Sequence, residues 1–292
     1  MKPIRHDSLY REISHYLESP GVSAKAFATS LATAAEKFQD ILDTGAQLGH
    51  GATRDTVALR DVFRNKYALL FVIAACVRYP FPSPEIDQVL SLAHRFTFRR
   101  FFVEGTGQSK YQKEVVELAR NFAMVTSLTP ADLAAAMRLR SEDASFEEAF
   151  ETYSVTTNKL GFYVLEMIEN HISSKTGTYV HSQNPRQHLE HILPKRPDSS
   201  WHSVTSDPTY TDYIARIGNL LILERDINSF VRNKSYTFKK SNSEKRDYAH
   251  SKLREPHTLG PFESSGSWDL NSIDERQKDL ANKYALKVWS LT

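Results

Sequence analysis

The sequence predicts a mainly α-helical protein that carries one small strand–strand–helix unit and closes with a C-terminal helix. Three observations lead to this fold class. Residues 1–182 repeatedly place apolar side chains three and four positions apart. Two short apolar runs then follow, HLEHILP and IGNLLIL, which suit strands better than helices. Residues 267–292 have the pattern of a capped amphipathic helix.

The helical pattern is clearest in two segments and at three helix starts. AKAFATSLATAAEKFQDIL (24–42) and LGFYVLEMIENHI (160–172) both gather their apolar residues on one helical face. Ser83 and Thr129 each precede a proline, and a capping hydroxyl before a proline is typical of a helix start. Ser145 has a glutamate three residues later, which is the spacing of a capping box. We therefore expect helices to begin at these three positions.

The composition of the chain changes near residues 173–187, a polar stretch with Gly, Asn and Pro. We expect a helical domain over residues 1–182 and a second domain over 183–292. In the second domain, the strands at 188–194 and 217–223 are separated by a loop of about 22 residues. A loop of this length is usually functional or partly structured. The segment after the second strand is a short helix candidate that runs into a basic stretch.

The charge of the chain is unevenly distributed. The formal net charge is +2, yet residues 232–254 hold eight Lys or Arg against two acidic residues, a balance of +6 that leaves −4 for the rest. A short basic stretch on a near-neutral body suits a polyanionic partner. A solvated helix face is the alternative interpretation of the same stretch.

The cysteine content and the apolar runs place the chain in a cellular context. Cys76 is the only cysteine, which rules out an intramolecular disulfide and a cysteine-based zinc site and fits a reducing cytoplasm. The longest apolar run, residues 68–77, has ten residues, whereas a bilayer span needs about 20. The N-terminal segment lacks the apolar region of a signal peptide. We therefore expect a cytoplasmic protein with no membrane partner and a buried helix at 68–77.

Histidines gather beside the first expected strand. Four of the eleven, at positions 181, 188, 191 and 202, fall within 22 residues, and Glu190 adjoins one of them. A carboxylate beside an imidazole suits a metal-dependent hydrolytic site. A Ser–His–Asp site stays open, although no G-x-S-x-G elbow supports it. No phosphate-binding glycine loop of an NTPase or dinucleotide-binding protein is present.

The segment IGNLLILERDINSFVRNKSY favours the metal site, because it adds Asn219 and, nine residues later, Asn228. With EHILP (190–194), this set resembles the HNH, or ββα-metal, nuclease pattern. More closely, it resembles the C-terminal nuclease domain of the GmrSD-type modification-dependent (type IV) restriction enzymes. Three further stretches resemble that family: FTFRRFF (96–102), GFYVLEMIE (161–169) and the spaced residues from Trp268 to Trp289. The resemblance covers the chain from about residue 20.

The resemblance assigns roles to the motif residues. Glu190 and Asn228 would hold one divalent ion, Mg²⁺ or Mn²⁺, through oxygen atoms. His191 would be the general base, since an imidazole with a pKa of about 6.5 accepts a proton near neutral pH. Asn219 would hold the loop and orient His191 through a hydrogen bond. The residues expected along a DNA backbone are Arg232, Asn233, Lys234, Lys239 and Lys240.

His188 is a weaker candidate. It lies two residues before Glu190 and would share that strand face, as a neighbour of the carboxylate or as a surface residue. Two departures from the family pattern also matter. The metal-side acid is Glu where most HNH enzymes have Asp, and the paired-cysteine knuckle is missing. We expect packing to hold the unit instead, with the 195–216 loop and Trp201 as its cover.

The expected function is therefore a metal-dependent DNA endonuclease, the effector part of a restriction or anti-phage defence system. Cleavage would leave a 5′-phosphate and a 3′-hydroxyl, and one site per chain suits nicking. The resemblance also implies a partner, an N-terminal sensor/NTPase domain or subunit for modified DNA, whose D-G-Q-Q-R motif does not occur here. Two alternatives remain open: a non-catalytic DNA- or protein-binding helical module with a vestigial nuclease site, and an RNase on the same site.

Overall fold

The computed structural model describes residues 9–44, 50–173 and 184–292. The first part of the chain is helical, with π-helical turns at η2 and η3. Its elements are α1 (Leu9–Leu17), α2 (Ala24–Thr44), α3 (His50–Val57), η2 (Ala58–Phe63), α4 (Leu69–Arg78), α5 (Pro84–Thr97), η3 (Phe98–Val103), α6 (Gln108–Met124), α7 (Pro130–Arg138), α8 (Asp143–Phe150) and α9 (Asn158–Ser173).

The second part contains two strands and short helices. Its elements are β1 (Gln187–His191), η4 (Ser199–Trp201), α10 (His202–Thr205), α11 (Tyr210–Tyr213), η5 (Ile217–Asn219), β2 (Leu220–Glu224), α12 (Arg225–Val231), α13 (Tyr236–Lys240), η6 (Tyr248–His250), η7 (Glu255–Thr258) and η8 (Gly260–Phe262). The chain closes with α14 (Leu270–Leu280), the π-helical η9 (Ala281–Ala285) and α15 (Leu286–Val288). The predictions of a mainly α protein, of two strands and of a closing helix are confirmed.

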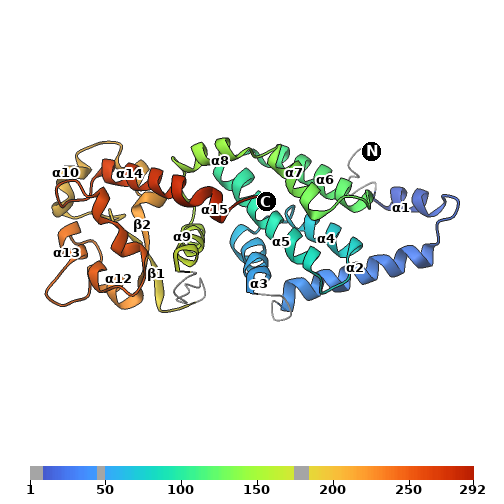
Figure 1. Cartoon of the computed structure of the whole chain (residues 1–292), viewed down its shortest axis with the longest axis horizontal. Helices are drawn as coiled ribbons and strands as arrows, with labels where there is room; N and C mark the ends of the chain where they lie inside the picture. The colour runs from blue at the N-terminus through green and yellow to red at the C-terminus, as the bar shows by residue number, and fades with distance from the viewer. Residues whose placement is uncertain (1–8, 45–49, 174–183) are drawn as a thin grey trace.

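The molecule is elongated (Figure 1). Helices α1 to α7 lie at one end, and the strands with α10 to α13 lie at the other. Between them stand α8 and α9, and the C-terminal end of the chain returns to this middle region through α15. The boundary expected between residues 182 and 183 lies outside the described residues, so the division into two domains stays a prediction.

Helix caps show where local sequence controls the fold. Ser83 caps α5 by accepting a hydrogen bond from the Ile86 main-chain nitrogen at 3.4 Å, and Thr129 forms a full capping box with Asp132 at the start of α7. The start predicted at Ser145 is wrong. Helix α8 begins at Asp143, so Ser145 already lies within its first turn. A hydroxyl residue followed three positions later by a glutamate also occurs inside helices. There the backbone N–H groups already donate to carbonyl oxygens of the helix and need no cap.

The C-terminal end of the chain completes the core of the helical part. Trp289 lies 4.6 Å from Phe98 between ring centroids, and its indole nitrogen donates to the Tyr163 hydroxyl at 2.8 Å. The buried Arg99 donates to the main-chain oxygens of Ser141 and Trp289. A buried guanidinium needs such acceptors because burial removes its charge from contact with water. The closing helix is therefore anchored between residues that are distant in sequence.

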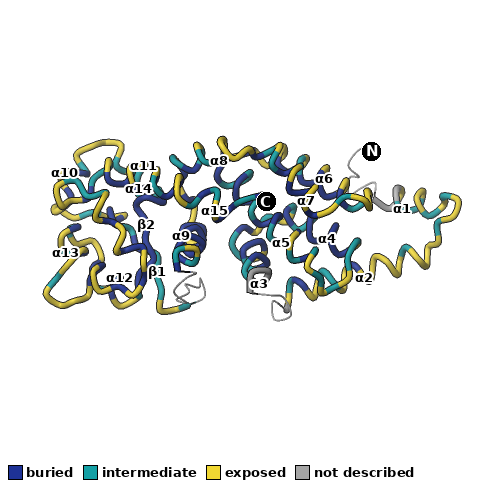
Figure 2. The backbone as a smooth tube through the Cα atoms, viewed as in Figure 1, coloured by how far each residue is buried: buried dark blue, intermediate teal, exposed yellow. Residues whose placement is uncertain are grey.

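The two-stranded sheet stands between two hydrophobic cores. The antiparallel register pairs Glu190 with Leu221 and His191 with Leu220. Alternate residues of β2 enter different cores: Leu220 and Ile222 pack with the helical part, and Leu221 and Leu223 pack with the second part. Figure 2 shows β2 and most of α9 as buried, in contrast to the exposed first half of α2. Burial on both faces explains why the IGNLLIL run is apolar throughout.

The long loop between the strands is partly structured, as predicted. It contains η4, α10 and α11, and its Trp201 is buried with 3% of its surface exposed. Trp201 packs in the same core as Leu221 and Tyr236, which agrees with its expected role as a cover. Residues 69–78 form the buried helix α4 that was expected there. Among the described residues, no helix is both long and apolar enough to cross a membrane.

Candidate functional site

Two residues that are 38 positions apart meet where β1 faces α12. The side-chain nitrogen of Asn228 donates to Glu190 Oε2 at 3.2 Å and to the Leu189 main-chain oxygen at 3.3 Å. Helix α12 begins directly after β2, and it packs against both strands of the two-stranded sheet. Strand alternation turns Glu190 toward this helix. The structure thus brings together the two residues that the sequence motif assigned to a metal.

The carboxylate of Glu190 is enclosed by donors, with 5% of the residue exposed. Lys239 Nζ lies 2.5 Å from Glu190 Oε1, and the Tyr248 hydroxyl donates to the same oxygen at 2.9 Å. Burial raises the pKa of Glu190, while the Lys239 ammonium and the Tyr248 hydroxyl oppose that rise. Oε1 therefore accepts from both Lys239 and Tyr248, and Oε2 accepts from the Asn228 amide.

Lys239 corrects one expectation about DNA binding. The residue was expected on the surface along a DNA backbone, but it is fully buried. Besides Glu190, its ammonium donates to the main-chain oxygens of His191 at 2.9 Å and Ile192 at 3.1 Å. A buried ammonium is held where it finds acceptors and a counter-charge. Lys239 therefore belongs to the site around Glu190, and Tyr248 is a member that the sequence did not indicate.

His191 is the residue next to Glu190 and points to the other side of the strand. It is half-buried, and its imidazole has no hydrogen-bond partner within the described parts of the chain. Burial, with the charges of Lys195 and Lys239, lowers the pKa of His191 to about 4. The imidazole is therefore neutral at pH 7 and has a free nitrogen that can accept a proton.

Asn219 is fully buried and binds main-chain groups. Its Oδ1 accepts from the Leu193 nitrogen at 2.7 Å, and its Nδ2 donates to the Leu193 oxygen at 2.9 Å and to the Ile214 oxygen at 3.1 Å. The expected hydrogen bond to His191 is not among these contacts. The amide holds the chain two residues beyond His191, so Asn219 fixes the end of β1 through the backbone.

The remaining residues expected to bind DNA are exposed. Arg232, Asn233 and Lys234 form the turn after α12, and Lys240 pairs with Glu263 at 2.7 Å. The indole nitrogen of Trp201 donates to the main-chain oxygens of Asn233 and Lys234, both at 3.2 Å. Seven of the eight basic residues of 232–254 are exposed, with Lys239 as the exception. The basic stretch is thus a surface feature beside the Glu190 cluster.

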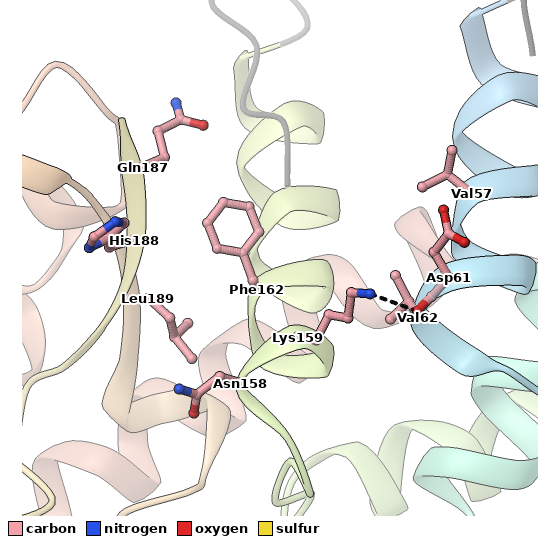
Figure 3. Close-up of a pocket in the computed structure, with 9 residues that line it drawn as sticks. All are labelled: Val57, Asp61, Val62, Asn158, Lys159, Phe162, Gln187, His188 and Leu189. Atoms are coloured by element: carbon pink, nitrogen blue, oxygen red, sulfur yellow. Dashed lines mark hydrogen bonds between the residues drawn. The ribbon is translucent and has the colours of Figure 1, made fainter. Parts of the chain in front are cut away.

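His188 lies at the rim of a cleft of about 450 Å³ between β1, α9 and η2 (Figure 3). Gln187 and Leu189 point toward α9 in this view, and the His188 ring is directed away from it. Lys159 lines the cleft and donates to the Asp61 main-chain oxygen at 2.9 Å. His202 is exposed at the start of α10, and His181 lies outside the described residues.

The donor set around Glu190 fits a single hard cation. No group of three or more His, Cys, Asp or Glu side chains that could hold a metal occurs in residues 9–44, 50–173 and 184–292. Asn228, one of the two expected ligands, carries an amide and so is not one of these residue types. Turning the Asn228 amide would present Oδ1 beside Glu190 Oε2, and side-chain amide nitrogen and oxygen are assigned from their contacts. With two protein oxygens as ligands, the remaining coordination positions of the ion would be filled by water and substrate oxygens, as Mg²⁺ prefers.

Comparison with known families places this site within a recognised domain. Residues 140–283 match the family model described as GmrSD restriction endonucleases, C-terminal domain. The match begins just before α8 and ends within η9, so it contains Glu190, His191, Asn219 and Asn228. No curated protein matches the chain. The family resemblance inferred from the motif is confirmed over these residues.

Proposed function

We propose, from the membership of residues 140–283 in the C-terminal domain family of GmrSD restriction endonucleases, that this chain is the nuclease part of a restriction system. Its reaction is the metal-dependent hydrolysis of phosphodiester bonds in DNA. The observation that carries this proposal is the 3.2 Å contact between Asn228 and Glu190. It joins a strand and a helix at one point, as a ββα-metal unit made of β1, β2 and α12 requires.

Each residue of the site has a chemical task. Glu190 and Asn228 would hold Mg²⁺ or Mn²⁺, and a bound ion supplies neutralisation of phosphate charge and stabilisation of the leaving oxygen. His191, neutral at pH 7, accepts the proton of the attacking water. A bound phosphodiester adds negative charge, which acts to raise the pKa of His191, while the metal ion opposes that rise. Asn219 keeps the end of β1 in place through Leu193.

The exposed basic turn is the proposed track for the DNA backbone. Arg232 and Lys234 are exposed beside Asn233, and Lys240 lies further along the same stretch. Phosphate contacts of this kind position the duplex without reading its sequence, and they weaken as salt increases. One site per chain makes a nick the expected product, with a 5′-phosphate and a 3′-hydroxyl. A sensor/NTPase domain or subunit for modified DNA is the proposed partner, in the cytoplasm.

A second candidate function rests on the Lys239–Glu190 ion pair. The ammonium lies 2.5 Å from the carboxylate, so Glu190 already has a cation as its partner. That arrangement would also suit a DNA- or protein-binding module whose nuclease site is vestigial. Such a module retains DNA in EDTA and after Glu190→Ala, and it cleaves nothing with any metal.

Plasmid cleavage separates these functions. Supercoiled DNA is incubated with Mg²⁺, Mn²⁺, Ca²⁺, Zn²⁺ or EDTA, using the wild-type chain, His191→Ala and His202→Ala. We expect cleavage with Mg²⁺ or Mn²⁺ and a loss of roughly 10²- to 10⁴-fold in His191→Ala, the usual contribution of a general base. The exposed His202 is the matched control and should leave the rate unchanged. Equal cleavage by His191→Ala would refute the proposed mechanism, and preference for structured RNA would identify an RNase.

A further inference from the structure

The side chains in contact at the proposed metal site carry no net charge. Glu190 contributes one negative charge and Lys239 one positive charge, while Tyr248 and Asn228 are neutral. Charged groups around this contact set are of both signs, and the buried Arg276, which acts on Tyr248, is itself paired with Glu255. Lys195 acts on His191, and Asp198 acts on Lys239. A divalent ion that approaches the protein alone therefore meets no excess of negative charge.

Lys239 has acceptors other than Glu190 that would hold it in place. Its ammonium is fully buried and has two further acceptors, the main-chain oxygens of His191 and Ile192 at 2.9 and 3.1 Å. The ring of Trp201 covers it, with 5.9 Å between Nζ and the ring centroid. Trp201 is itself held by hydrogen bonds from its indole nitrogen to the main-chain oxygens of Asn233 and Lys234. An incoming metal and this ammonium must therefore share one carboxylate.

We propose that Lys239 is a positioning residue that makes metal binding at Glu190 depend on DNA. In the free chain the ammonium compensates the buried carboxylate and holds it toward Asn228. A divalent ion then binds weakly, because two positive groups would adjoin one negative group. A phosphodiester supplies the missing negative charge, so the metal and DNA bind together. This inference rests on the proposed function, since it concerns the same metal site.

The coupling is measurable without cleavage. Mn²⁺ binding is followed by electron paramagnetic resonance in a His191→Ala background, which blocks hydrolysis, with and without a short DNA duplex. We expect the duplex to lower the Mn²⁺ dissociation constant by about tenfold or more. By linkage, Mn²⁺ tightens DNA binding by the same factor.

Lys239→Met tests the origin of the coupling. Without the ammonium, we expect Mn²⁺ to bind about tenfold more tightly in the absence of DNA, and the effect of the duplex to shrink to less than about threefold. Lys283→Met is the matched control, because Lys283 forms an exposed ion pair with Asp279 at 2.7 Å and lies on η9. It should bind Mn²⁺ as the His191→Ala parent does.

The outcomes distinguish this inference from the proposed function. If the parent binds Mn²⁺ equally well with and without DNA, or if Lys239→Met leaves the coupling intact, the inference is wrong while the nuclease assignment stands. If no Mn²⁺ binds in either condition and the wild-type chain cleaves no plasmid, the proposed function itself fails. If Lys239→Met does not fold, the dependence of metal binding on DNA is still tested by the effect of the duplex on Mn²⁺ binding to the His191→Ala parent. Glu190→Gln/Lys239→Met then gives a chain with neither buried charge, in which Mn²⁺ binding should be absent.

Discussion

The side-chain amide of Asn219 binds both main-chain groups of Leu193, accepting from its nitrogen at 2.7 Å and donating to its oxygen at 2.9 Å. The two residues are 26 positions apart. This closed pair extends the strand pairing beyond its last register pair, His191 with Leu220. The buried Asn219 side chain thus takes over from the main-chain hydrogen bonds where the two-stranded sheet ends. It fixes the segment that carries the general base of the proposed reaction.

Asn219→Ala should destabilise the protein strongly. The change leaves both main-chain groups of Leu193 buried without these partners, and each unsatisfied group costs roughly 1–3 kcal/mol. We expect a loss of about 3 kcal/mol in urea unfolding. Asn282→Ala is the control, because Asn282 is exposed on η9, and changes at such positions usually stay within about 0.5 kcal/mol. Equal stability of the two variants would contradict the role assigned to Asn219.

Gly218 is required by the close approach of α14. A Cβ atom built on Gly218 would lie 2.2 Å from the main-chain oxygen of Ile273 and 3.1 Å from the Gln277 main-chain nitrogen. The conflict involves backbone, so Gly218→Ala must displace the helix. We expect destabilisation of about 3 kcal/mol, seen as a lower melting temperature. Gly260→Ala, where no atom lies within 4 Å of the added carbon, should melt near the wild type. A melting temperature unchanged by Gly218→Ala would show that α14 can shift freely.

The imidazole of His191 should titrate well below an ordinary histidine. Burial and the charges of Lys195 and Lys239 lower its pKa to about 4, so folding resists its protonation. The stability that comes from the neutral imidazole is present above pH 6.5 and is lost as the pH falls toward 4. Nuclear magnetic resonance of labelled histidine measures this pKa directly, and the signal missing in His191→Ala assigns it. A midpoint near 6.5 would contradict the burial of this side chain.

Glu255 should make the protein sensitive to alkaline pH. Burial, opposed by Arg276 and reinforced by Glu169, raises the pKa of Glu255 to about 8. The protonated form is favoured in the fold, so stability is greatest at low pH and is lost as the pH rises toward 8. Compared with Glu255→Gln, the wild type should lose about 2–3 kcal/mol of unfolding free energy between pH 6 and pH 8. Parallel pH profiles of the two proteins in urea unfolding would refute this assignment.

Local patterns predicted the elements better than their contacts. The helices at 24–42 and 160–172 were predicted from apolar spacing, and the structure has α2 and α9 there. The capped starts at Ser83 and Thr129 follow from hydrogen bonds between residues three positions apart. Ser145 shows the limit of this reasoning. Its spacing satisfied the same rule, but the helix began two residues earlier, at Asp143.

The candidate site was predictable only in part. The spacing of Glu190, Asn219 and Asn228 identified a family pattern, and the family match over residues 140–283 agrees with it. The contacts of Tyr248 and Lys239 with Glu190 were not predictable, because these residues lie 58 and 49 positions away with no periodic relation to it.

The sequence by itself determined the order of the helices, the two strands and the match of residues 140–283 to a restriction-endonuclease domain family, because these depend on short-range spacing. Only the tertiary structure decided which charges are buried. Lys239 looked like one of eight solvated basic residues, yet it is the one drawn inward. A buried carboxylate requires a counter-charge wherever the chain can supply one, and that requirement is met by packing in three dimensions, not by position in the sequence.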